Sequence, residues 1–162
     1  MRRTPRCIFV MTRIRTFLWY KAGDLDGAVM LYSSIFGEGF KLSSQNRLGG
    51  PDAPLFTAGF SIHGHELVGM SCEGGADFNT AVSLSVVVEG GQAEVDRVWA
   101  AIIADGGAAG QCGWCKDKFG FSWQIIPREM EQLLSDTSTA GFAGRAMRGM
   151  SKIVIEGLRE KE

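Results

Sequence analysis

The stretch CGWCKDKFGFSWQIIP occupies residues 112–127 and carries the clearest structural signal in the chain. It predicts two strands, Gly113–Asp117 and Phe121–Ile126, which are joined by a turn at Lys118-Phe119-Gly120. Pro127 is expected to end the second strand, because proline has no backbone N–H to continue a ladder. The stretch therefore predicts an antiparallel strand pair near the C-terminal end of a sheet.

Upstream of this pair the sequence predicts a strand and an amphipathic helix. The strand covers Val82–Val88, where β-branched residues are frequent, and the turn Gly90-Gly91 follows it. The helix is marked by apolar residues at helical spacing: Val95, Val98, Trp99, Ile102 and Ile103. Gly106-Gly107 are expected to end this helix, and short helices are expected downstream at residues 128–158.

The N-terminal half contains a similar order of elements. Thr16–Tyr20 is an aromatic-rich strand candidate, and Asp24 is expected to cap a helix that ends at Gly37. His63-Gly64 is expected to form a hairpin turn. Three strands are expected after the helix: Phe40–Arg47, Leu55–Ile62 and Glu66–Cys72.

The two halves are related by a nearly constant offset. Thr16 precedes Ser83 by 67 residues and Val29 precedes Val95 by 66, so strand and helix recur together. This predicts an α+β fold of duplicated βαβββ units. We expect one domain at residues 13–158, with repeats at about 13–75 and 78–127, C-terminal helices at 128–158 and an N-terminal extension at 1–12.

Composition and charge exclude several classes of protein. The 17 Lys+Arg and 18 Asp+Glu give a formal charge of −1, so no nucleic-acid partner is expected. The longest apolar runs fall short of the roughly 18 residues of a membrane span, so no membrane partner is expected. Four irregularly placed cysteines favour a reducing, cytoplasmic location over a disulfide scaffold.

The residues at several positions resemble a known family. Thr16–Tyr20, Phe78-Asn79, Val82–Leu84 and above all residues 112–127 are similar to the PhnB-like family, often labelled 3-demethylubiquinone-9 3-methyltransferase. This family lies in the vicinal-oxygen-chelate superfamily, with glyoxalase I, bleomycin-resistance proteins and extradiol dioxygenases. The resemblance extends roughly from Arg13 to Leu158. It implies a cup-shaped mixed sheet with outer helices and a ligand inside the cup.

The resemblance also allows the superfamily's metal site to be tested. Many members hold a divalent metal through His and Glu side chains on the first and last strands of both halves. The matching positions in this sequence are Thr16, Ser71, Ser83 and Gln124. Because neutral hydroxyls and an amide are poor ligands for a divalent ion, we expect neither a metal nor another cofactor in the cup.

Period-two alternation indicates which side chains face the cup. Ser83 and Gln124 should face it, whereas Leu84 and Trp123 should pack under the helices. The expected pocket residues are Thr16, Ser71, Ser83, Ser85, Ser122 and Gln124, with Trp114 free to lie on either face. Such neutral groups suit an uncharged, partly apolar ligand. The alternative is a cup that is filled by side chains or by a partner chain.

Three further motifs are interpreted as structural. Cys112 and Cys115 form a C-x-x-C pair on a predicted strand, which favours reduced thiols over a zinc or redox site. His63 and His65 flank a hairpin turn and are expected to face solvent. Asp117 is expected to cap a turn or to pair with Lys116. Trp19 and Trp99 are expected to pack between helix and sheet.

Three functions remain open from the sequence. The first is metal-independent binding of a small molecule, and the second is a metal-independent lyase, isomerase or transferase, with Glu73 and Asp117 as the nearest titratable candidates. The third is an interaction protein whose cup is sealed by dimerisation. Methyl transfer is not expected, because the sequence has no glycine-rich donor site between a parallel strand and a helix.

A homodimer is expected in each of these cases. A duplicated βαβββ unit leaves sheet edges to cover. The C-terminal segment is also more apolar than a free tail, through Phe142, Met147, Met150, Ile153, Val154, Ile155 and Leu158. We expect this segment to dock against the sheet or against the partner chain.

Overall fold

The computed structural model describes residues 12–159, so the proposed extension at residues 1–12 lies almost wholly outside the described residues. The first repeat contains β1 (Thr16–Tyr20), α1 (Asp24–Phe36), η1 (Gly37–Gly39), β2 (Phe40–Arg47), β3 (Leu55–Ile62) and β4 (His65–Ser71). The second contains β5 (Ser83–Val88), α2 (Gly91–Ile103), η2 (Ala104–Gly106), β6 (Ala108–Ala109), β7 (Trp114–Lys116) and β8 (Ser122–Pro127). The chain then forms α3 (Arg128–Ser135), α4 (Ala140–Arg148) and η3 (Ile155–Leu158).

The strands form two four-stranded mixed sheets with the same topology. One has the order β1-β4-β3-β2 and the other the order β5-β8-β7-β6. In each sheet the first strand is parallel to the last strand of its repeat, and the other neighbours are antiparallel. The predicted α+β fold of duplicated βαβββ units is therefore confirmed. The sequence did not define β6, because two alanines carry no strand signal.

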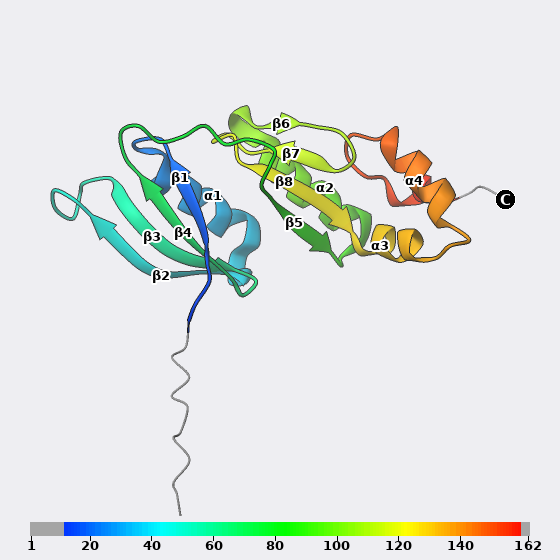
Figure 1. Ribbon diagram of the computed structural model, residues 1–162, viewed down its shortest axis with the longest axis horizontal. Helices are drawn as coiled ribbons and strands as arrows, with labels where there is room; N and C mark the ends of the chain where they lie inside the picture. Colours follow the sequence, from blue (N-terminus) through cyan, green and yellow to red (C-terminus); the bar gives the residue numbers. More distant parts are fainter. Residues whose placement is uncertain (1–11, 160–162) are drawn as a thin grey trace, which may run out of the picture.

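The two repeats share one hydrophobic core on the helix side of both sheets. In Figure 1, α1 and α2 lie behind the strands of their repeats. The Trp123 ring of β8 lies 5.2 Å from the Tyr32 ring and 5.7 Å from the Phe36 ring, both of α1. Helix α1 therefore packs against its own sheet and against the second sheet. Burial of these aromatic rings gives the contact between the repeats most of its stability.

The hairpin between β3 and β4 has the backbone that the sequence predicted. His63 and Gly64 both have positive φ, at 45° and 84°. Two consecutive residues in the left-handed region give this turn a twist, and the twist matches that of the two antiparallel strands that the turn joins. Gly64 adopts this conformation at little cost, whereas His63 is held in it by its Phe36 and Gly39 neighbours.

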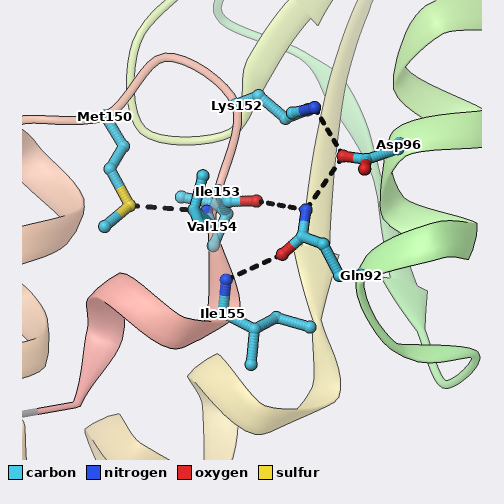
Figure 2. Close-up of polar contacts among 7 residues, drawn as sticks. All are labelled: Gln92, Asp96, Met150, Lys152, Ile153, Val154 and Ile155. Atoms are coloured by element: carbon cyan, nitrogen blue, oxygen red, sulfur yellow. Dashed lines mark hydrogen bonds and ion pairs between the residues drawn. The ribbon is translucent and has the colours of Figure 1, made fainter.

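The C-terminal segment docks on its own chain. Ile153 and Leu158 are buried with Ile126 of β8 and Met130 of α3. Figure 2 shows that the carboxamide of Gln92 donates to the Ile153 carbonyl (3.2 Å) and accepts from the Ile155 N–H (2.8 Å). We call residues 150–158 the strap. Of the two docking surfaces expected from the sequence, the strap therefore uses the sheet of its own repeat.

The length and composition of the helices decide whether one of them could cross a membrane. Among residues 12–159, none of the helices has the length and apolar character needed to cross a membrane.

Candidate functional site

Each sheet has one face that α1 and α2 do not cover, and we call it the open face. On the second sheet, the Gln124 side chain donates a hydrogen bond to the Ser83 hydroxyl at 2.8 Å. In register, Gln124 lies between Ser85 of β5 and Trp114 of β7. Side chains of paired residues share a face, so Trp114 lies on the open face as well. These four residues form a neutral, partly aromatic surface.

The opposite face of β5 and β8 is the helix face. Trp123 is 1 % exposed, and Leu84 packs against the same core. The alternation that the sequence predicted for these two strands is therefore present in the structure. Ser122 shares the face of Gln124 but is fully buried, with its hydroxyl 3.5 Å from the Asn79 carbonyl. The segment between the repeats covers it, so Ser122 is not at the surface.

The structure does not bring Thr16 and Ser71 to this surface. Thr16 shares the face of the buried Leu18 and Tyr20, and its hydroxyl lies 3.0 Å from Nε2 of His65. The Ser71 hydroxyl accepts from the Gly23 N–H and donates to the Lys21 carbonyl, so it fixes the turn before α1. Both therefore face the helix side, and the expectation that they face the cup is corrected.

The open face of the first sheet is instead aromatic. Phe17 is 56 % exposed and Trp19 is 41 % exposed, and both point away from α1. Val68 and Met70 are their register partners on β4. The expectation that Trp19 packs under a helix is therefore wrong. The signal was present in β1, because Leu18 and Tyr20 could only alternate with Phe17 and Trp19.

The residues on the open faces do not fit the metal site of the superfamily. The positions that face outward on β1, β5 and β8 near Gln124 are aromatic, aliphatic, hydroxyl or amide side chains, and the one outward carboxylate of β4, Glu66, lies at the far end of the first sheet beside Arg13. Neither histidine lies among them, since both belong to the β3–β4 hairpin. Within residues 12–159, no group of three His, Cys, Asp or Glu side chains is arranged to hold a metal ion. Neutral oxygen donors alone do not offset the dehydration of a divalent ion.

A groove between the two repeats contains both histidines. One part, of about 600 Å³, is lined by Phe36 and His63 from the first repeat and by Val86–Val88 and Arg97 from the second. A second part, of about 380 Å³, shares Phe36 and His63 and extends to His65. The imidazoles therefore lie beside Val86–Val88 of β5, and Glu89 and Glu94 also line the groove.

Asp117 lies on the helix side and is buried, which is rare for a carboxylate. Its Oδ1 accepts from the N–H groups of Phe119 and Phe121, and its Oδ2 accepts from Tyr32 (2.7 Å) and Trp123 (2.9 Å). Burial raises the pKa of the Asp117 carboxyl, and these four donors oppose that shift. The carboxylate caps a turn, as predicted, and it also joins the repeats. It is too enclosed to act on a ligand.

The other candidates from the sequence are structural or exposed. Cys115 is buried on the helix face, and this burial raises the pKa of its thiol to about 12. Cys112 lies in the loop before β7, where its N–H donates to the Met150 carbonyl. Glu73 is exposed in the segment between the repeats. The buried Cys115 thiol is therefore a structural group and is not a nucleophile.

Comparison with known proteins identifies relatives of this architecture. A family model described as 3-demethylubiquinone-9 3-methyltransferase matches residues 12–126. A search of curated proteins finds no match. The matched region contains both repeats and ends within β8, so α3, α4 and the strap lie outside it.

Solved structures support the same relationship. A putative 3-demethylubiquinone-9 3-methyltransferase, the PhnB protein from Bacillus cereus, is 26% identical with a TM-score of 0.61, and the match covers 72% of this chain and 99% of that one. Protein PA1353 from Pseudomonas aeruginosa has 18% identity, a TM-score of 0.57 and coverage of 71% and 98%. The fosfomycin resistance protein FosX from Listeria monocytogenes shares the fold at 14% identity, with a TM-score of 0.55 and coverage of 76% and 97%.

Proposed function

The chain belongs to the family described as 3-demethylubiquinone-9 3-methyltransferase, and from its fold and its open faces we propose that it binds a small, partly apolar organic molecule without a metal. The observation that carries this proposal is the exposure of Phe17 and Trp19 on a sheet face that no helix covers. Large aromatic side chains are seldom left exposed together unless they contact a ligand or another chain.

The neutral polar groups of the second sheet support the same function. Gln124 and Ser83 are hydrogen-bonded to each other and only partly buried, so they can exchange this bond for bonds to a ligand. An amide and a hydroxyl each offer a donor and an acceptor without a charge. The part of the ligand that lies on the second sheet is therefore uncharged.

Methyl transfer is not supported, although the family description names it. The parallel pairs β1–β4 and β5–β8 are each connected through a helix and two antiparallel strands, and the turns before α1 and α2 lack the glycine pattern of a dinucleotide-type cofactor site. A metal-independent lyase, isomerase or transferase is the alternative. Its best titratable candidate, Asp117, is engaged in the core, and this favours binding over catalysis.

The FosX structures raise the question of metal-dependent chemistry. One FosX structure is described as a complex with Mn(II) and sulfate. The corresponding strands of this chain carry no imidazole or carboxylate on their open faces near Gln124, so we propose that binding here proceeds without a metal. Metal analysis of protein purified without chelators is expected to give well under one equivalent.

The binding proposal is tested with a fragment screen by ¹H–¹⁵N NMR. Aromatic and aliphatic fragments are expected to shift the indole resonance of Trp19 and the side-chain amide of Gln124. The variant Gln124→Leu should weaken the polar hits, and Gln132→Leu, at an exposed position of α3, is the matched control. A screen in which hits shift only residues outside the open faces would refute the proposal.

We also propose that the protein is a homodimer in the cytoplasm. Phe17, Val82 and Val87 are exposed on or beside β1 and β5, and each of these strands has one unpaired edge. A sheet edge that is not protected by charged side chains or by a β-bulge tends to pair with another chain. A partner placed here would also supply the missing wall of the ligand site.

A further inference from the structure

One end of the open face of the first sheet is cationic. A small hollow of about 110 Å³ lies there, and it is lined by Arg13 and Arg15 before β1, by Ser43 of β2, by Ser61 of β3 and by Glu66 of β4. Lys41 is the register partner of Ser61 and so lies on the same face. Two arginines therefore line the hollow beside the Glu66 carboxylate, with Arg13 4.0 Å from it, and Lys41 adds a third positive charge to the same face.

The cationic end is continuous with the aromatic surface along one strand. Residues 13, 15, 17 and 19 are separated by two positions each, so an extended backbone places Arg13, Arg15, Phe17 and Trp19 on one side. Within β1 this alternation is observed, because Leu18 and Tyr20 are buried on the other side, and Arg13 and Arg15 are placed by their shared hollow with Glu66. The face thus presents positive charge at one end and aromatic rings at the other.

We propose that this face binds an amphiphilic anion, with a carboxylate or phosphate group held at Arg13 and Arg15 and an apolar body lying on Phe17 and Trp19. The inference rests on the proposed function and names the class of ligand. The hollow has room for one oxyanion group but not for a whole ligand. Guanidinium groups are suited to oxyanions because they donate paired hydrogen bonds, and the hydroxyls of Ser43 and Ser61 can donate further ones.

The energetic roles of the two ends differ. Arg13 and Arg15 are exposed, so an ion pair with them is screened by water and salt and contributes little affinity alone. Apolar burial against Phe17 and Trp19 supplies the affinity, and the cationic end supplies the preference for an anion. An oxyanion without an apolar body, such as inorganic phosphate, is therefore expected to bind too weakly to measure.

The test compares a carboxylate with its neutral amide on the same apolar body, and it adds a phosphate as a second anion. Binding of 4-phenylbutanoate, phenyl phosphate and the neutral 4-phenylbutanamide is measured by isothermal titration calorimetry and by the Trp19 indole NMR signal. At low salt we expect the anions to bind roughly three- to tenfold more tightly than the amide, and the difference to shrink at high salt. Arg15→Gln should reduce the difference, because only Arg13 remains in the hollow, and it should weaken anion binding more than amide binding. Arg148→Gln, at an exposed position of α4, is the control with the same loss of charge.

The outcomes separate this inference from the proposed function. Equal binding of anion and amide to the unmodified protein would overturn the inference and leave the proposed function intact. If Arg15→Gln and Arg148→Gln reduced the preference for the anions over the amide equally, the inference would also be overturned. The preference would then come from the net charge of the protein and not from the hollow. Failure of all three compounds, together with an empty fragment screen, would overturn both. Arg15 is exposed, so Arg15→Gln is expected to fold normally.

Discussion

Asp117 connects the two repeats through a single carboxylate. Its oxygens accept from two backbone N–H groups of its own turn, from the Tyr32 hydroxyl of α1 and from the Trp123 indole of β8. Tyr32 in turn lies 3.0 Å from the Tyr20 hydroxyl of β1. All four partners of the carboxylate are donors, so a group that can only accept is needed at this position.

Replacing this carboxylate is expected to be strongly destabilising. In Asp117→Asn, an amide NH₂ replaces one oxygen and faces two donors, which leaves buried groups without partners. We expect the free energy of unfolding to fall by about 3 kcal/mol. Urea denaturation followed by circular dichroism measures it, and Asp105→Asn, at an exposed position, is the control. A loss no larger than that of the control would contradict the role of Asp117 as a connection between repeats.

The same burial makes stability depend on pH. Because burial raises the pKa of Asp117 above its ordinary value near 3.8, the folded protein holds this proton to a higher pH than the unfolded chain does. Between the ordinary and the raised pKa the folded state binds more protons, so this group's contribution to the free energy of unfolding falls as pH rises. Titration of the Asp117 carboxyl carbon by ¹³C NMR checks the direction. A midpoint below the ordinary value would show that the four donors outweigh burial.

At the scale of elements, strand positions were easier to predict than strand faces. The bounds of β2 and β3 agree with the predicted strands, because turns with glycine, proline or His63-Gly64 delimit them. Thr16, however, was matched to a cup position through the family resemblance, which depends on the exact alignment of β1. A shift of one residue in the alignment turns every side chain of a strand to the other face. The aromatic open face of β1 was therefore missed.

The strap was predicted only as an apolar tail, because its contacts are not local. Its backbone bonds to the Cys112 and Gly113 N–H groups and to the Gln92 side chain, and these lie 38 to 63 residues away in sequence. Lys152 pairs with Asp96 of α2, and Ser151 donates to the Gly110 carbonyl (Figure 2 shows the Gln92 and Lys152 contacts). No spacing rule predicts such partners.

Gln92 is expected to decide whether the strap stays docked. In Gln92→Ala, the Ile153 carbonyl and the Ile155 N–H lose their partner, and we expect a loss of about 1–2 kcal/mol in the local opening free energy. Hydrogen exchange followed by mass spectrometry measures this opening in residues 150–158. Gln132→Ala, at an exposed position of α3, should leave it unchanged. Equal protection of the strap in both variants would show that burial of Ile153 alone holds it.

At the scale of the whole molecule, two of the exposed apolar residues, Phe17 and Val82, lie together at the junction of the two repeats. A hollow of about 180 Å³ lies at this junction, lined by Phe17 of β1 and by Phe78, Val82 and Phe121 from the following segment and the second repeat. The two sheets are not joined by a strand ladder within residues 12–159, so β1 and β5 each retain an unpaired edge. The sequence anticipated the uncovered edges but not their location. That location depends on how α1 packs against Trp123.

Pairing of two chains at this junction is the last prediction. A symmetric interface that covers Phe17, Trp19 and the edges of β1 and β5 should bury more than about 1,000 Å² in total, the size that a stable specific contact needs. Light scattering coupled to gel filtration is expected to give the mass of two chains at micromolar concentration. The double variant Phe17→Ser/Trp19→Ser should shift the protein toward the monomer, because it removes the apolar burial that favours association. Met30→Ser removes an even more exposed apolar side chain from α1 and should remain dimeric. A monomeric mass for the unmodified protein would refute the dimer, and an equal shift in both variants would place the interface elsewhere.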